Sequence, residues 1–322
     1  MRMEIWADVV CGWAYIGKRR VEKAVEGLDV EVVWRPFRID PMAPERAVPF
    51  EEAVADPMVE DALRQCTPDE LTPGENRVRM SLIAAEEGFG WRWGAAWRAS
   101  SHDAHRLIAL ALDAGGSGLQ DAVAERVLKA HFIDGLDISG RETLHRIAAE
   151  AGFAEGAELL DGGAGDELVR ELLLRGKAIG VETSPTIVVG GRALAGAQSP
   201  AVIRAFVLEG GEEPRRLPEE VERLRMAESL LDLRDPLGAL VLLKPLLDEH
   251  GEDRGVLTVA GRAYFASAQL GRARTVLERL VAAVPDDAYA RHLLGRTLQR
   301  QGLREEAEPH LRMASAMSPE YG

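Results

Sequence analysis

The chain opens with an apolar segment, a mixed helical segment and a second apolar segment. Residues 3–10 combine apolar side chains with isolated acids, which is typical of a strand that enters a core. Between residues 15 and 25, apolar residues recur near helical spacing, so a helix is expected to begin just after Cys11. Residues 30–37 form a second apolar run that ends at prolines. A strand, a helix and a strand in this order predict a parallel βαβ unit.

A mostly helical region follows, from about residue 44 to about residue 180. Apolar residues three and four apart predict helices over 78–87, 103–114, 119–133 and 142–151, with glycine-rich turns between them. Strand signals return at residues 186–189, where Gly190 and Gly191 predict a hairpin. A last helix of this part is expected over residues 199–208.

The last third of the chain contains an internal repeat. Small or apolar side chains recur in register at one fixed spacing: Ala239, Ala273 and Ala307; Leu243, Leu277 and Leu311; Gly261 and Gly295; Pro285 and Pro319. This spacing is the period of the tetratricopeptide repeat, a helix–turn–helix unit whose small residues let two helices approach closely. We therefore expect about three repeats in an all-α domain at residues 212–322, behind a first domain at residues 1–211.

Composition and charge narrow the classes of partner. The 322 residues include 46% hydrophobic residues, enough for two packed domains. With 39 basic and 53 acidic residues the net charge is −14, which argues against nucleic acid and anionic membranes as partners. Acidic residues interrupt the apolar opening, and no uncharged apolar stretch has the length of a membrane span, so neither a secretory signal nor a membrane span is expected. The expected compartment is the cytoplasm.

The chain has two cysteines, Cys11 and Cys66, so a structural disulfide framework is not expected. Cys11 follows a predicted strand and precedes a predicted helix, where a thiolate would face the unpaired N–H groups of the first helical turn. Such a placement lowers the pKa of a thiol and makes it nucleophilic at neutral pH. Cys11 is therefore the candidate catalytic residue, with a small buried apolar side chain as the alternative. The histidines show no spacing typical of zinc, and no metal site is expected.

Residues 8–20, which contain Cys11, resemble the active-site segment of the DsbA-like family that includes FrnE and 2-hydroxychromene-2-carboxylate isomerase. Further segments resemble the same family in the same order, at 34–41, 103–107, 131–138, 183–186 and 196–198. The resemblance extends over residues 1 to about 209. It implies an α/β chain with a thioredoxin fold, split by a large helical insertion at about 44–180 and followed by the repeats.

The resemblance also implies a substrate site beside Cys11. Pro185 is expected to be cis, and the backbone of Ser184 is expected to face a substrate thiol or peptide. The residues expected to bind substrate are Gly12, Trp13, Ala14, Ser184 and Pro185. Lys18 and Arg19 lie in the family segment, but on a helix such residues are expected on a solvated face. His105 is expected to be a core or interface histidine.

The sequence departs from the family pattern at Ala14, where oxidoreductases of this type have the second cysteine of a CxxC motif. Cys11 can form a mixed disulfide with a substrate, but no cysteine three residues on can resolve it. Three explanations stay open. A low-molecular-weight thiol such as glutathione or an equivalent resolves the intermediate, or Cys66 does so from a distance, or Ala14 is an engineered replacement. We predict a monothiol oxidoreductase or isomerase-like enzyme that acts on a thiol or disulfide substrate and holds no cofactor tightly.

Two alternative functions accompany this prediction. Isomerase and kappa-class glutathione transferase relatives bind glutathione at the equivalent site without a second cysteine. In that case the substrate is a small aromatic or polyketide-like molecule, in a cleft lined by Trp13, Trp91, Trp93 or Trp97, although tryptophans so close in sequence usually indicate core. The other alternative is a non-catalytic binding module. In every case the repeats are expected to bind a protein partner, or to support self-association as a homodimer.

Overall fold

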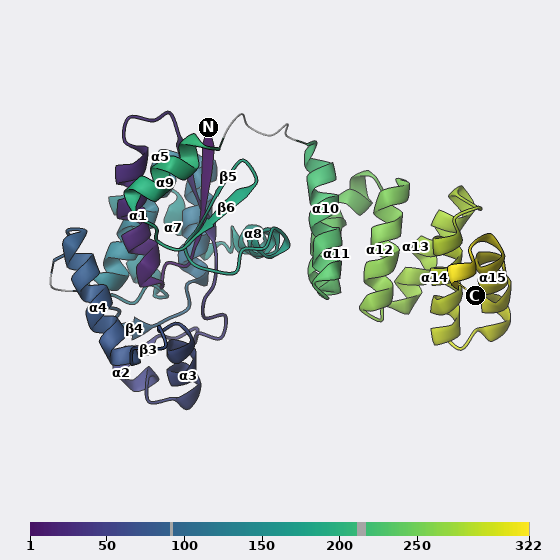
Figure 1. Ribbon diagram of the computed structural model, residues 1–322, viewed down its shortest axis with the longest axis horizontal. Helices are drawn as coiled ribbons and strands as arrows, with labels where there is room; N and C mark the ends of the chain where they lie inside the picture. Colours follow the sequence, from purple (N-terminus) through teal and green to yellow (C-terminus); the bar gives the residue numbers. More distant parts are fainter. Residues whose placement is uncertain (91–92, 211–216, 322) are drawn as a thin grey trace. The chain divides into compact units, whose positions relative to one another are not determined.

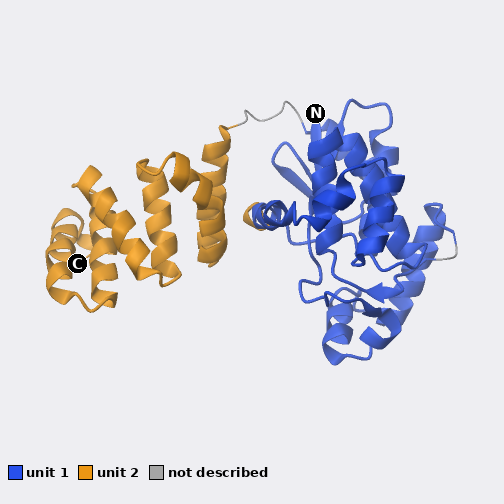
Figure 2. Ribbon diagram, turned by 180° about the vertical axis from the view of Figure 1, so that it is seen from behind, with its two compact units in different colours: residues 1–176, 181–215 blue, residues 177–180, 216–322 orange. Residues whose placement is uncertain are grey.

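The computed structural model describes residues 1–90, 93–210 and 217–321 (Figure 1). Residues 1–176 and 181–215 form one unit, and residues 177–180 and 216–322 form a second (Figure 2). The expected boundary between residues 211 and 212 lies outside the described residues. Within the described part of the chain, no helix is long and apolar enough to cross a membrane.

The first unit is built on a four-stranded sheet in the order β2-β1-β5-β6. Strand β1 (Arg2–Ala7) pairs in parallel with β2 (Glu31–Pro36) and antiparallel with β5 (Thr186–Val189), which forms a hairpin with β6 (Arg192–Ala195). Helix α1 (Gly12–Val25) connects β1 to β2, as the predicted βαβ unit requires. Ile5 lies between Trp34 and Ile187 at the centre of the sheet and is buried. The thioredoxin-like fold predicted from the sequence is confirmed.

The insertion between β2 and β5 is mostly helical, as predicted. It contains β3 (Val48–Pro49), α2 (Phe50–Ala53), α3 (Pro57–Gln65), α4 (Pro73–Glu86), β4 (Trp97–Arg98), α5 (His102–Phe132), α6 (Arg141–Glu150), α7 (Gly156–Asp161) and α8 (Asp166–Ala178). Gly115 and Gly116 leave the helical conformation inside α5, with φ +71° at Gly116, so a kink separates the two helices predicted there, although α5 runs across it. Helix α5 packs on β2, and α1 packs with α9 (Pro200–Leu208) (Figure 1).

The second unit is a stack of three helix pairs, as the sequence repeat predicts. The pairs are α10 (Glu219–Asp232) with α11 (Pro236–Glu249), α12 (Arg254–Ala266) with α13 (Leu270–Ala283), and α14 (Ala288–Arg300) with α15 (Arg304–Met317). In the second and third pairs, a leucine of the second helix fills the space beside a glycine of the first. A Cβ atom at Gly261 would lie 2.6 Å from Leu277 Cδ2, and one at Gly295 would lie 2.6 Å from Leu311 Cγ. The recurring glycines are therefore required by close helix packing.

Candidate functional site

Cys11 caps the N-terminus of α1, shortly after the end of β1. Its backbone has extended dihedrals, φ −91° and ψ 116°, and its N–H donates to the Asp8 carbonyl oxygen at 3.0 Å. The Cys11 Sγ atom donates to the Ser184 carbonyl oxygen at 3.3 Å. The Ser184–Pro185 peptide bond is cis, the geometry that the family resemblance implies. The structure thus brings Cys11, Ser184 and Pro185 together at the start of α1.

The electrostatic surroundings of Cys11 differ from the sequence-based expectation. Cys11 is only 8% exposed. Burial raises the pKa of the Cys11 thiol, because the thiolate loses the water that would solvate it, and the negative charge of Asp8 raises it further. Hydrogen bonds with Ser184 and with the backbone of Ala14 and Trp13 act in the opposite direction without outweighing burial. The expected lowering of this pKa is therefore wrong for the structure, and the resting thiol is protonated at neutral pH.

Asp8 is fully buried and connects the segments that meet at Cys11. Its backbone N–H donates to Ser184 Oγ at 2.9 Å, and its carboxylate accepts from the N–H of Ile39 at 2.7 Å. His105 Nε2 of α5 lies 3.2 Å from the same carboxylate. Sequence reasoning missed this role, because the isolated acids of this apolar run indicated only a strand that enters a core. The position of Asp8, at the end of the strand and three residues before Cys11, could have indicated this role.

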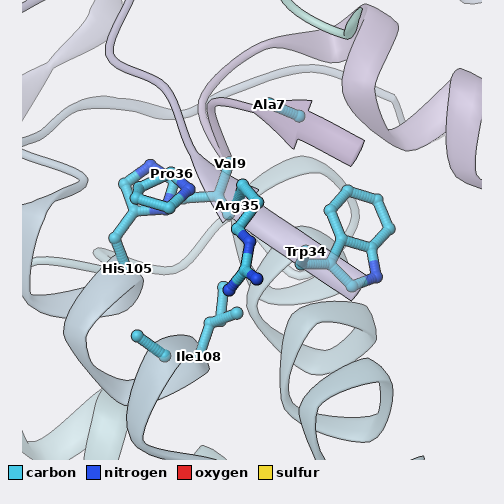
Figure 3. Close-up of a pocket in the computed structure, with 8 residues that line it drawn as sticks. Ala7, Val9, Trp34, Arg35, Pro36, His105 and Ile108 are labelled. Atoms are coloured by element: carbon cyan, nitrogen blue, oxygen red, sulfur yellow. The ribbon is translucent and has the colours of Figure 1, made fainter. Parts of the chain in front are cut away.

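His105 is buried, as predicted for a core histidine, and its Nε2 atom also lies 3.0 Å from the Phe37 carbonyl oxygen. It lines a small pocket between β1, β2 and α5, together with Pro36 and Ile108 (Figure 3). The pocket has a volume of about 10 Å³, room for no more than about one water molecule. Among the described residues, its wall contains neither Trp13, Trp93 nor Trp97, which were expected to line a substrate cleft. His131, near the end of α5, is also buried, and burial lowers its pKa to about 4.

Helix α4 covers the start of α1. A Cβ atom at Gly12 would lie 2.6 Å from Met80 Cε and 3.5 Å from the Trp93 ring. The guanidinium carbon of Arg79 lies 5.8 Å from the ring centre of Trp13. Ala14, two residues further along α1, is buried. Gly12, Trp13 and Ala14, which the sequence assigned to substrate binding, thus adjoin Cys11 in a region that α4 shields.

The described tryptophans of the insertion, Trp93 and Trp97, pack against neighbouring residues. Trp93 stacks on Phe132 with ring centres 5.0 Å apart, and it also contacts Phe89 and Tyr15 at 5.0 and 5.9 Å. Trp97 donates its ring N–H to the Gly135 carbonyl oxygen at 2.9 Å. Trp91 lies outside the described residues. The described tryptophans of this cluster therefore have the core role, as the usual interpretation predicts.

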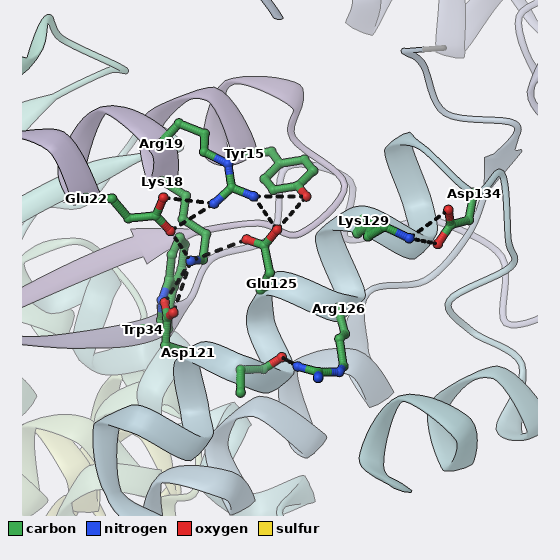
Figure 4. A network of polar contacts seen from close by, with 11 residues as sticks. Tyr15, Lys18, Arg19, Glu22, Trp34, Asp121, Glu125, Arg126, Lys129 and Asp134 are labelled. Carbon is green, nitrogen blue, oxygen red and sulfur yellow. Dashed lines mark hydrogen bonds and ion pairs between the residues drawn. The ribbon is translucent and has the colours of Figure 1, made fainter. Parts of the chain in front are cut away.

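The buried side chain of Lys18 lies in an ion-pair network between α1 and α5 (Figure 4). It is 3% exposed, and its Nζ atom lies 2.5 Å from Glu22, 3.0 Å from Asp121 and 3.3 Å from Glu125. Arg19 pairs with Glu22 and Glu125. The expectation of a solvated helix face is wrong for Lys18, because α5 of the insertion packs carboxylates against this side of α1. The network fixes the active-site helix to the insertion.

Cys66 ends α3 and is exposed, and both Cys11 and Cys66 are free thiols. A resolving role for Cys66 stays a prediction. In residues 1–90, 93–210 and 217–321, no group of three or more histidine, cysteine or acidic side chains is arranged to hold a metal ion.

Comparisons with known proteins agree with this architecture. The family model of the DSBA-like thioredoxin domain matches residues 2–207, and that of the tetratricopeptide repeat matches residues 230–297. The crystal structure of a probable DsbA oxidoreductase from Streptomyces coelicolor is similar, with 26% identity and a TM-score of 0.56 over 68% of this chain and 93% of that one. A 2-hydroxychromene-2-carboxylate isomerase structure matches with 14% identity and a TM-score of 0.46, over 65% of this chain and 93% of that one. The uncharacterized protein YwbO of Bacillus subtilis is 39% identical over 41 residues, which are 13% of this chain and only 20% of YwbO.

Proposed function

This chain belongs to the DSBA-like thioredoxin domain family, and from that premise we propose that it is a thiol–disulfide oxidoreductase that reacts through Cys11 alone. The observation that carries the proposal is the position of the Cys11 Sγ atom, at the N-terminus of α1 and 3.3 Å from the Ser184 carbonyl oxygen. Ala14 provides no second thiol in the same helical turn. The similarity to the probable DsbA oxidoreductase of Streptomyces coelicolor supports the reaction class.

The reaction begins when the Cys11 thiol gives up its proton to solvent. The free N–H groups at the N-terminus of α1 stabilise the thiolate once water or substrate reaches it. The thiolate attacks one sulfur atom of a disulfide, so that a mixed disulfide with Cys11 forms and the other sulfur leaves as a thiolate and takes a proton. The substrate disulfide is the oxidant in this step, and the leaving thiol is the reduced product.

A second thiol must then attack the mixed disulfide to release Cys11. We propose that a low-molecular-weight thiol, glutathione or an equivalent, does so, because Ala14 is not a thiol. The exposed free thiol of Cys66 is the alternative resolving group. Such a pool is kept reduced in the cytoplasm, which we propose as the setting. The repeat unit is proposed to bind a protein partner, since stacked repeats of this kind present extended binding surfaces.

The test is formation of a mixed disulfide in the Cys66→Ala background. The protein is incubated with bis(2-hydroxyethyl) disulfide, and mass spectrometry of the digested chain locates the adduct. We expect an adduct on Cys11 that added glutathione removes, and none in the Cys11→Ser control. A chain that forms no adduct even after long incubation contradicts the proposal. That result would favour the non-catalytic binding module, which the burial of Cys11 already makes the second candidate.

A further inference from the structure

Helix α4 packs over the start of α1, next to Cys11. The Met80 Cε atom lies 2.6 Å from the position that a Cβ atom at Gly12 would take. The rings of Trp93 and Phe132 lie 3.5 and 3.8 Å from the same point. Arg79 lies over the ring of Trp13, the next residue of α1, and Cys11 itself is 8% exposed. Met80 therefore packs against the residue that directly follows Cys11, at the end of α1 that a substrate must reach.

The packing of α4 is too thin to make this cover permanent. All of α4 is described, and its buried residues are Asn76 and Ala84, which lie on the same helix face as Met80. The Asn76 Oδ1 atom is buried and has no hydrogen-bond partner among the described residues. A buried oxygen atom without a partner costs free energy, so it destabilises this position of α4. The opposite face carries Val78 and Leu82, which are 62% and 54% exposed. A helix with so few buried contacts belongs to the least stable parts of a fold.

One end of α4 is firmly attached to α1. Glu87, directly after α4, lies 2.7 Å from Arg20 Nε and 2.5 Å from Lys23 Nζ. Burial alone would raise the pKa of Glu87, but the two cations outweigh it and lower this pKa, so the carboxylate is charged at neutral pH. Gly88 follows with φ +97°, a conformation that only glycine adopts readily. The attachment and the glycine together form a pivot at this end of the helix.

We propose that Met80 controls access to Cys11, and that α4 turns about Glu87 and Gly88 to withdraw Met80 when a thiol or disulfide substrate binds. The inference rests on the proposed function in one respect, that Cys11 is the reacting group. Small disulfides need a small displacement of Met80, whereas bulky ones need the whole of α4 to move. Met80 thus selects substrates by size. Withdrawal also hydrates Cys11 and removes the burial that disfavours its thiolate.

The test compares the alkylation rates of Cys11 in the Cys66→Ala background with a small reagent, iodoacetamide, and a bulky one, fluorescein-5-maleimide. When opening is fast, such rates follow the population of the open state. Met80→Ala is expected to raise the alkylation rate with the bulky reagent on the order of tenfold, because shortening this side chain shifts the equilibrium of α4 from the closed to the open position. The rate with iodoacetamide should rise less. Leu82→Ala, on the exposed face of the same helix, is the matched control and should leave both rates unchanged.

The inference is overturned if Met80→Ala and the parent are alkylated at equal rates with both reagents. It is also overturned if Leu82→Ala accelerates alkylation as much as Met80→Ala does, because a general loosening of α4 would then explain the result. Gly12→Ala is a second variant, since its new methyl group displaces the flexible end of Met80 without shortening any side chain. It should also favour the bulky reagent. If Met80→Ala accelerates alkylation but still forms no mixed disulfide, the access role of Met80 stands and the oxidoreductase function fails.

Discussion

Replacing Lys18 by methionine should destabilise the first unit strongly, although the sequence pattern predicts that this residue lies on a solvated helix face. Methionine fills a similar volume but leaves Glu22, Asp121 and Glu125 without their shared cation. Removing one partner from a buried ion pair costs about 3–5 kcal/mol. The three carboxylates are 25% to 44% exposed, so water compensates part of the loss. We therefore expect the free energy of unfolding to fall by about 2–3 kcal/mol.

The ion pairs of Lys18 also predict how the loss of stability in Lys18→Met changes with pH. Burial alone would raise the pKa of Glu22, but Lys18 and Arg19 outweigh it and lower this pKa. A carboxyl group with a lowered pKa in the folded state stabilises the fold above its ordinary pKa, and the stabilisation is lost as the pH falls through the folded value. The stability difference between the parent and Lys18→Met should therefore be largest near neutral pH and shrink below about pH 4.5, the ordinary value for Glu22.

The assay is urea unfolding followed by tryptophan fluorescence. All six tryptophans precede residue 98, so this signal reports on the first unit alone. Lys23→Met is the matched control, because Lys23 lies on the same helix but is 52% exposed, and exposed ion pairs contribute about 0–1 kcal/mol. The reasoning is refuted if Lys18→Met is no less stable than the Lys23→Met control, or if the difference persists unchanged in acid.

Two further predictions concern the active-site helix and the repeats. Ala14→Cys should restore a dithiol, so that mild oxidation protects Cys11 from alkylation in the variant and not in the parent; continued alkylation after oxidation would contradict the assignment of position 14. Gly261→Ala should destabilise the repeat unit by about 1–2 kcal/mol, because the clash with Leu277 exceeds the gain in helix propensity. Gly271→Ala, where the new methyl group meets open space, should instead stabilise by about 0.4–1 kcal/mol. Urea unfolding followed by far-UV circular dichroism checks both, and a loss of stability in both variants would show that the clash is not the cause.

The predictable part of the fold was encoded in local patterns. The strands at residues 2–7 and 186–189 and the helix after Cys11 follow from hydrophobic periodicity, and the three helix pairs follow from the sequence repeat. The positions of Ser184 and Pro185 beside Cys11 came from the family resemblance, since they are 173 or more residues away in the sequence.

The failed predictions depend on contacts that no local pattern encodes. Lys18 was expected in water because its neighbours in sequence form a polar face, but Asp121, 103 residues further on, buries it. The thiol of Cys11 was expected to ionise readily because it lies at a helix N-terminus. Met80, on an insertion helix, packs against Gly12 at that end of α1, and Cys11 is buried. Helix position alone does not determine a pKa when another element controls solvation.

The contacts of Asp8 have a consequence for how this protein can diverge in evolution. Asp8 binds Ile39, His105 and Ser184, which lie 31, 97 and 176 residues further along the chain. Substitutions at residues in direct contact are not independent in their effects. A change at any one of these positions therefore alters which changes the others tolerate. The Gly261–Leu277 contact closes within a single repeat, so a change at one of these two residues has its nearest compensating position only 16 residues away, whereas the compensating positions of the active-site segments are spread over the whole first unit.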